Sequence, residues 1–288
     1  MKPADVLIVG QGLAGTLLAW ECERSGIEFV IADQGHATAA SRAAAGIINP
    51  VTGRRLVKPW RVTDLLPQAR STYQEMGDVL GAPIWRDLRV RRRFADDTER
   101  AAFARKAETG ELAPFVVEPG DADGFWIEQA ARVDLDTMLA ATRARWRAQG
   151  RLQERRVDVS AEQRHYRWVV DCTGLDGARG AMAGVAPWEF AQGEVLQVQV
   201  AGLDPGVVLN RRHWVMPAGA HAAWVGATHV PGVVAREPTE GGRHVLERSA
   251  REMLVGEFQV IGHRAGVRVT VPDKLPVIGP IAPGLGVI

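Results

Sequence analysis

Three glycines near the amino terminus have the spacing of a phosphate-binding turn, Gly10-x-Gly12-x-x-Gly15, directly after an apolar run. In such a turn the first glycine permits the tight bend, the second lets a pyrophosphate approach the backbone, and the third lets helix and strand pack closely. Free N–H groups at the start of the following helix can then bind phosphate oxygens. We therefore expect a phosphate-containing ligand at these glycines, with Leu13 and Ala14 beside it.

An acidic residue follows at the distance that a nucleotide ribose requires. Asp33 lies 18 residues past Gly15, at the end of a second apolar run, and its carboxylate can accept hydrogen bonds from ribose hydroxyls. Gln34, the next residue, is expected at the same site. The glycine spacing alone also fits an ordinary glycine-rich turn, but here strand, helix, strand and acid occur in the required order. The pattern predicts a dinucleotide site and does not separate NAD from FAD.

Hydrophobic periodicity predicts the elements that position these residues. Apolar runs at 6–9 and 27–32 predict buried parallel strands, and the helical spacing at 16–25 completes a right-handed βαβ unit. Further helices are expected at 64–80, 98–108, 134–149 (with Asp134 as its cap) and 239–255. Further strands are expected at 84–94, 124–133, 166–172, 194–200, 207–215 and 222–229, the last three antiparallel.

Composition excludes several classes of protein. The 288 residues are 46% hydrophobic and 24% charged with a net charge of +1, whereas nucleic-acid-binding proteins usually show a basic excess. Two cysteines, Cys22 and Cys172, are too few for a disulfide framework or a cysteine-built zinc site, and the histidines lack metal-ligand spacing, so we expect no metal. No apolar run reaches membrane-spanning length and no signal peptide is evident, which favours a cytoplasmic protein. The arginines at 91–93 are typical of a solvated strand.

Four stretches, in order along the chain, resemble the D-amino-acid-oxidase-like family of FAD-dependent amine oxidoreductases. They are VLIVGQGLAG with Asp33, SRAAAGIINP at 41–50, VVDCTG at 169–174, and AGVR at 265–268 followed by PDKLPVIG at 272–279. The resemblance implies an α/β fold with a Rossmann-like FAD-binding domain at 1–62, 133–186 and 265–288. It implies a discontinuous substrate domain, built on an antiparallel or mixed sheet, at 63–132 and 187–264. The apolar end at 283–288 resembles a strand cut short, so we expect the natural chain to continue.

The resemblance also implies which residues hold FAD. The segment at 41–50 is similar to one that runs beneath the flavin ring, and its small residues leave room for backbone N–H groups to face the flavin nitrogens. An alanine-rich helix start would give the same pattern, and Arg42 would then be a solvated surface charge. The backbone of Val157, or of Val159, is expected to cover the adenine. The other expected FAD contacts are Ser41, Arg42, Ala44, Ala45, Gly46, Ile47, Thr173, Gly174 and Gly279.

Arg268 is the residue that the resemblance implies for the catalytic site, where it would bind a substrate carboxylate. A planar guanidinium matches a carboxylate through two parallel hydrogen bonds. A solvent-facing arginine on a sheet is the alternative, and Arg264 is a weaker candidate for the same role. The implied substrate is a small amine or amino acid. The implied reaction passes a hydride from the substrate carbon to flavin N5 and leaves an imine that hydrolyses.

Other interpretations stay open. The chain could be a flavin hydroxylase or reductase of the same wider fold, or a non-catalytic flavin-binding subunit. It could also resemble proteins that act on an aminomethyl group carried by tRNA, although the near-neutral charge disfavours nucleic-acid binding. The substrate, the electron acceptor, the mode of flavin attachment and the oligomeric state are not predicted by the sequence.

Overall fold

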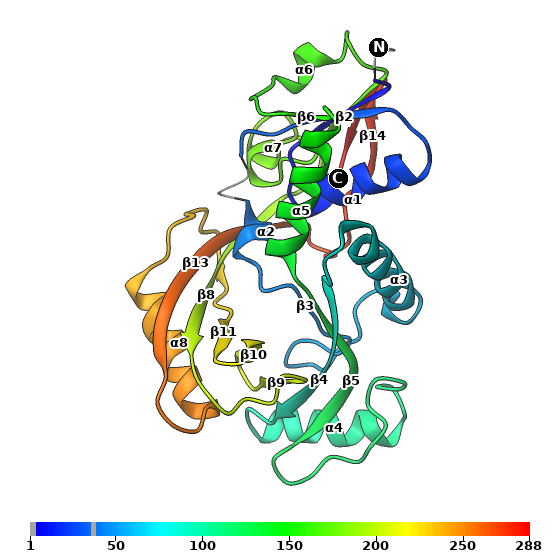
Figure 1. Cartoon of the computed structure of the whole chain (residues 1–288). Helices are drawn as coiled ribbons and strands as arrows, with labels where there is room; N and C mark the ends of the chain where they lie inside the picture. The colour runs from blue at the N-terminus through cyan, green and yellow to red at the C-terminus, as the bar shows by residue number, and fades with distance from the viewer. Residues whose placement is uncertain (1–3, 36–38) are drawn as a thin grey trace.

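The computed structural model describes residues 4–35 and 39–288, and within them the strands form two sheets (Figure 1). The first sheet has six strands in the order β14-β15-β7-β1-β2-β6. Its strands run parallel except at the β14 edge, where β14 and β15 are antiparallel. The bounds are β1 Val6–Val9, β2 Phe29–Ala32, β6 Leu152–Gln153, β7 Trp168–Asp171, β14 Gly279–Ala282 and β15 Leu285–Val287.

The central strands of this sheet are apolar because helices cover them. Ile8 and Phe29 are buried in one cluster with Trp146, and the rings of Phe29 and Trp146 meet edge to face at 5.9 Å. Asp134 caps the helix α5, as expected, by accepting a hydrogen bond from the N–H of Thr137. The strands β1 and β2 are parallel neighbours with α1 between them in the chain, so the predicted Rossmann-like βαβ unit is confirmed. The helices of this half are α1 Leu13–Arg24, α5 Leu135–Ala148, α6 Val159–Glu162 and α7 Leu175–Arg179.

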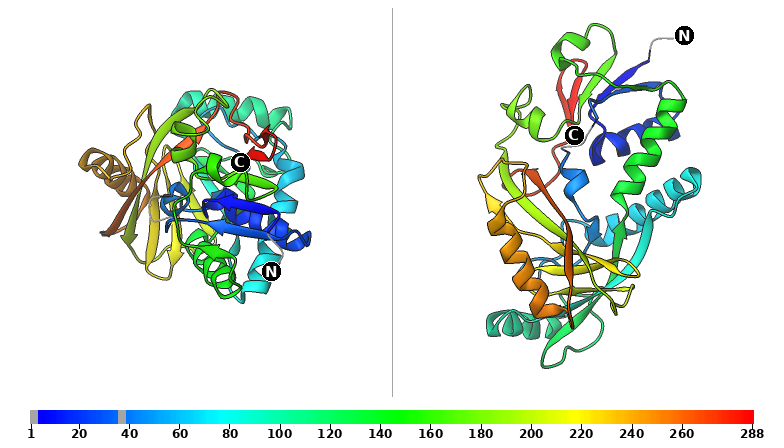
Figure 2. Two further views of the ribbon diagram at one scale, coloured as in Figure 1. Left: turned by 90° about the horizontal axis from the view of Figure 1, so that it is seen from above. Right: turned by 60° about the vertical axis from the view of Figure 1, so that its left-hand side comes forward.

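The second sheet has nine strands among the described residues. The order is β12-β8-β11-β10-β9-β4-β5-β3. The strands β11 and β12 pair with successive parts of β8, at 195–199 and 191–192, and β13 pairs with β8 along its whole length. Figure 2 shows the helix α8 (Glu240–Met253) lying against one face of this curved sheet, where Leu246 and Ala250 are buried. The bounds are β3 Ile47–Ile48, β4 Trp85–Arg93, β5 Gly124–Val133, β8 Glu189–Gln199, β9 Val207–Asn210, β10 Trp214–Gly219, β11 Ala222–Gly226, β12 Val230–Pro231 and β13 Gln259–Thr270.

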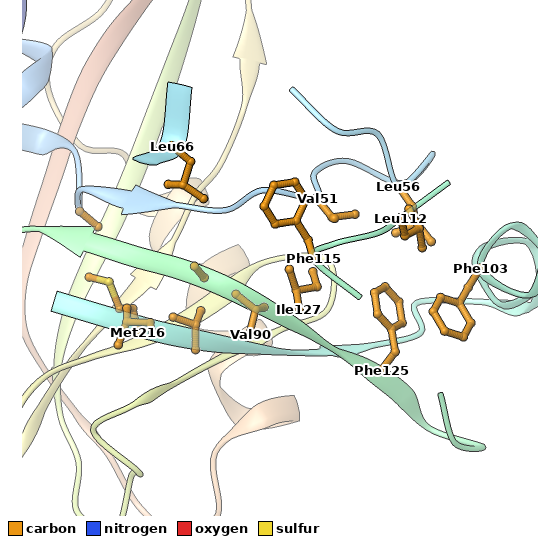
Figure 3. Close-up of a cluster of buried hydrophobic side chains, with 14 of the residues drawn as sticks. Val51, Leu56, Leu66, Val90, Phe103, Leu112, Phe115, Phe125, Ile127 and Met216 are labelled. Atoms are coloured by element: carbon orange, nitrogen blue, oxygen red, sulfur yellow. The ribbon is translucent and has the colours of Figure 1, made fainter. Parts of the chain in front are cut away.

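The opposite face of the second sheet packs against the chain that follows β3. Val51 and Leu56 are fully buried there, against Phe115 and the side chains of β4 and β5 (Figure 3). The rings of Phe103 and Phe125 stack with centroids 4.2 Å apart. This half also contains α3 Val62–Leu80 and α4 Asp97–Glu108. A single apolar layer therefore joins the loop after β3 to the sheet.

Two expectations about the second sheet are wrong. The single strand expected at 207–215 is two antiparallel strands, β9 and β10, because the chain reverses at 211–213 and the N–H of Arg211 bonds to the carbonyl of His213. The arginines at 91–93 are not all solvated. Arg92 is 5% exposed and forms an ion pair with the buried Glu99, since alternation along β4 turns it toward the interior.

The division into two domains stays a prediction. Most strands of each sheet come from the segments assigned to it, but β3 pairs with β5 of the second sheet, and β13 runs through the expected boundary at 264/265. The cytoplasmic placement also stays a prediction. Among the residues that the structure describes, no helix combines the length and apolar character that crossing a membrane requires.

Candidate active site

The glycine turn between β1 and α1 has the geometry that its spacing predicts. Gly10 has φ +97°, and a Cβ on it would lie 2.8 Å from the carbonyl oxygen of Cys172. A Cβ on Gly15 would lie 1.9 Å from the carbonyl oxygen of Gly10, so helix and turn touch there. A Cβ on Gly12 would meet only the hydroxyl of Ser41, at 3.4 Å. Gly10 and Gly15 are therefore required by packing, and Gly12 keeps the backbone accessible to a ligand.

Ser41 lies beside the start of α1. Its Oγ accepts a hydrogen bond from the N–H of Leu13 over 2.9 Å. This contact brings the helix α2 (Ala40–Ala43) to the N–H groups that can bind phosphate. The fold thus joins the first two stretches of the predicted site, which are more than twenty residues apart in sequence.

Asp33 is buried at the end of β2 and fixed by several donors. The N–H of Gln11 donates to Oδ2, and the N–H of Gly35 donates to Oδ1, each over 2.8 Å. Arg143 from α5 donates to Oδ1 over 2.8 Å and also to Oε1 of Gln11. Gln34 is exposed. The carboxylate therefore anchors the glycine turn at the position where this fold binds ribose.

Arg143 and Gln11 were not predicted from the sequence as residues of this site. Gln11 occupies a variable position of the glycine motif and is fully buried, with its Nε2 3.3 Å from Oγ1 of Thr142. Arg143 is one of many arginines, and Asp33, to which it donates, lies 110 residues away in the sequence. A polar pair, Thr142 and Arg143, on a helix that covers the βαβ unit was the only available signal.

Only the first residues of the segment expected beneath the flavin are helical. Residues 40–43 form α2, and Ala44 then turns to an extended conformation that leads into β3. A Cβ on Gly46, which has φ +76°, would lie 2.0 Å from the carbonyl oxygen of Val133. Ala44 is exposed, whereas Ala45 is buried. Small residues are thus needed for packing on one side and leave the other side open.

A cavity of about 270 Å³ lies at the carboxyl ends of β7 and β15, where parallel sheets of this kind bind ligands. Asp171 lines it and accepts hydrogen bonds from the N–H and Oγ1 of Thr173, at 2.8 and 2.6 Å. Gly174, with φ +60°, precedes α7. The wall is Ala14, Asp171, Gly174, Gly177, Ala178, Met182, Trp188, Val269, Thr270, Val271, Leu275, Pro276, Val277, Val287 and Ile288.

The remaining expected contacts lie around this crevice. Gly279 in β14 pairs with Val287, a residue of the cavity wall. Val157 packs in the cluster that contains Val9 and Ala32, at the ends of β1 and β2. Burial raises the pKa of the Cys172 thiol, which supports a packing role for this cysteine.

Arg268 lies on β13 opposite Ala191, with its side chain exposed. Strand alternation places it on the same face as Arg264 and Gly266. That face approaches α2, because a Cβ on Gly266 would lie 2.9 Å from the Cβ of Ala43. Within residues 4–35 and 39–288, no carboxylate forms an ion pair with Arg268, and no group of three metal-ligating side chains is found.

Comparison with known proteins agrees with this geometry. The family model "FAD dependent oxidoreductase" (DAO) matches residues 5–288. Glycine oxidase of Pseudomonas aeruginosa is 26% identical, over 96% of this chain and 85% of that protein. The structure of glycine oxidase from Geobacillus kaustophilus superposes with a TM-score of 0.79 at 21% identity, covering 99% of this chain and 88% of that one. L-amino acid deaminase from Proteus vulgaris gives a TM-score of 0.73 at 15% identity, covering 100% and 89%.

These matches confirm the predicted fold and cofactor. The structural similarities, all below 25% identity, concern the fold, and the family match extends over nearly the whole chain. The open space beside Gly12, the start of α1 and the crevice at the strand ends fit the phosphates and flavin of FAD. The chain belongs to the DAO family of FAD-dependent oxidoreductases.

Proposed function

We propose that this protein oxidises a small amine or amino acid that carries a carboxylate, with FAD as the electron acceptor. The observation that carries the proposal is Arg268, an exposed guanidinium without a carboxylate partner among the described residues, on the sheet face that approaches α2. An arginine in that state can bind a carboxylate through two charge-assisted hydrogen bonds. Family membership and the relatives named glycine oxidase support the same reaction class.

The residues that would hold FAD come from six segments. The turn from Gly10 to Gly15 would bind the pyrophosphate, Asp33 and Gln34 the ribose, and Val157 the adenine. Segment 41–47 would contact the flavin, and Thr173, Gly174 and Gly279 would complete the crevice. When bound, FAD supplies the acceptor for the hydride that leaves the substrate carbon.

The chain's own contribution is binding and orientation. Arg268 would fix the substrate carboxylate, which aligns the carbon that loses the hydride and converts a bimolecular encounter into an oriented one. The imine product would hydrolyse in water. No strong base is required from the protein, because the flavin carries the difficult chemistry.

The proposal is tested by recording the visible spectrum of purified protein and then adding glycine, sarcosine, proline or a D-amino acid without oxygen. Yellow protein that one of these compounds bleaches would support amine oxidation and identify the substrate class. Yellow protein that none bleaches would reject these substrates and favour a hydroxylase, a reductase or a non-catalytic flavin-binding subunit. Colourless protein that takes up no added FAD would overturn the proposal.

A further inference from the structure

Three charged side chains connect the segment expected beneath the flavin with α5 and β13. Arg264 Nη1 donates to the carbonyl oxygen of Arg42 and to Oδ2 of Asp136, each over 2.8 Å. The other carboxylate oxygen, Oδ1, lies 3.2 Å from Nη1 of Arg42. One carboxylate therefore bridges two arginines, and one of those arginines also binds the backbone of α2.

Packing holds this network on the sheet. The guanidinium of Arg264 lies over the ring of Trp224, with Cζ 4.7 Å from the ring centroid. Trp224 is 6% exposed, so the aromatic surface beneath the guanidinium is fixed. A planar guanidinium can stack on a ring and donate in its own plane at the same time, which a lysine ammonium cannot do.

The same strand carries the residue proposed to bind substrate. Arg264 and Arg268 are four residues apart on one face of β13, a separation of roughly 13 Å along an extended strand. Between them, Gly266 packs directly on Ala43 of α2. The position of α2 relative to Arg268 is thus set by two contacts to one strand, a glycine without a side chain and an arginine that binds a carbonyl.

We propose that Arg264 and Asp136 are positioning residues, which hold segment 40–46 at a fixed distance from Arg268 and thereby place the flavin relative to the substrate carboxylate. This inference rests on the proposed function. Neither residue needs to touch the flavin or the substrate. Their effect is transmitted through the carbonyl of Arg42 and the backbone that follows it.

A simple electrostatic effect on the cofactor predicts a different outcome. The pyrophosphate of FAD is anionic, so removal of the Asp136 charge by Asp136→Asn would strengthen FAD binding if long-range charge were decisive. If Asp136 positions α2, the same substitution weakens FAD binding. The sign of the change in the FAD dissociation constant therefore separates the two explanations.

The experiment compares Arg264→Met, Arg264→Lys and Asp136→Asn with the wild-type protein. Arg243→Met is the matched control, because Arg243 forms an ion pair with Glu247 within α8, on the other face of the sheet. FAD affinity is measured by flavin fluorescence, and hydrogen exchange of the peptide that covers residues 40–48 is measured on the apoprotein. We expect FAD binding to weaken about tenfold in Arg264→Met and Asp136→Asn, and amide exchange in this peptide to accelerate.

Arg264→Lys retains the charge but not the planar group that stacks on Trp224 while it donates, so we expect it to bind FAD nearly as weakly as Arg264→Met. Tighter FAD binding by Asp136→Asn, full rescue by Arg264→Lys, or exchange rates equal to those of Arg243→Met would each overturn the positioning role. Failure of the proposed function is seen separately, as wild-type protein that binds no FAD or that no amine reduces.

Discussion

Arg143 Nη1 lies 2.8 Å from Asp33 Oδ1, and the two side chains are only 11% and 6% exposed. The same nitrogen donates to Gln11 Oε1, so one guanidinium joins the acid of β2 to the glycine turn. A buried carboxylate and a buried guanidinium stabilise each other, because either charge alone would be costly to keep away from water. The ribose side of the predicted FAD site is therefore built partly by α5.

Replacing Arg143 by Met should leave Asp33 as a buried carboxylate without this cation. Breaking a buried ion pair costs about 3 kcal/mol in the free energy of unfolding, and we expect FAD affinity to fall at least tenfold as the carboxylate reorients. Urea unfolding and FAD titration measure the two effects. Arg147→Met is the control, because Arg147 pairs with the exposed Glu154 at the same end of α5. FAD affinity equal in both variants would show that Arg143 does not shape the ribose site.

The contact between α1 and the glycine turn predicts that Gly15 tolerates no side chain. A Cβ there would lie 1.9 Å from the carbonyl oxygen of Gly10, a backbone atom that cannot rotate away. We expect Gly15→Ala to cost about 3 kcal/mol in unfolding free energy and to abolish detectable FAD binding.

Gly241→Ala is the matched control for this substitution. Gly241 is also helical, in α8, and a Cβ on it meets nothing within 4 Å. Alanine favours helix over glycine by up to about 1 kcal/mol, so this variant should be slightly more stable. If Gly15→Ala shows the same small change in urea midpoint, the packing argument for the third glycine is wrong.

The sequence was sufficient where the determinants are local. The glycine turn, Asp33 and the Asp134 cap are short-range patterns, and β1, α1 and the cap of α5 formed as the sequence predicts. Contacts between segments distant in sequence were not accessible. Nothing near Arg143 or Arg264 in sequence indicates its partners, because helix packing and strand register decide those contacts. The reversal at 211–213 was missed since alternation continues on both sides of a turn without glycine or proline.

The buried pair of Arg92 and Glu99 offers a test of the second sheet. Their side chains are 6% and 1% exposed, and Asn210 of β9 also accepts from Arg92. Glu99→Gln leaves the arginine charge buried, so we expect a loss of about 3 to 5 kcal/mol in unfolding free energy. Arg100→Ala, which breaks the exposed pair with Asp97, should cost less than about 1 kcal/mol.

A double substitution, Arg92→Met with Glu99→Leu, removes both charges from the interior. Its cost should be well below the sum of the two single costs, because neither charge is then left unpaired. Additive costs measured by urea unfolding would mean that the two side chains contribute independently, contrary to the ion pair.

His213 predicts a dependence of stability on pH. Burial lowers the pKa of this imidazole, whose Nδ1 lies 2.6 Å from Oγ of Ser249. As the pH falls through about 6.5, the unfolded chain takes up a proton before the folded protein does, so stability decreases and levels off below the folded-state pKa. His213→Gln should reduce the change in the urea midpoint between pH 7 and pH 5. His221→Gln, at an exposed turn, should show the same change in midpoint as the wild type.

Arg268 yields the sharpest test of substrate recognition. If its guanidinium binds the substrate carboxylate, Arg268→Met should raise the KM for an amino-acid substrate roughly a hundredfold, the equivalent of losing one paired charge-assisted contact. An amine without a carboxylate should be oxidised equally by the variant and the wild type. Acetate, which has the carboxylate but no amine, should perturb the flavin spectrum of the wild type only.

Arg86→Met, at an exposed position of β4, controls for loss of a surface charge. An unchanged KM for the amino acid in Arg268→Met would mean that another residue binds the carboxylate.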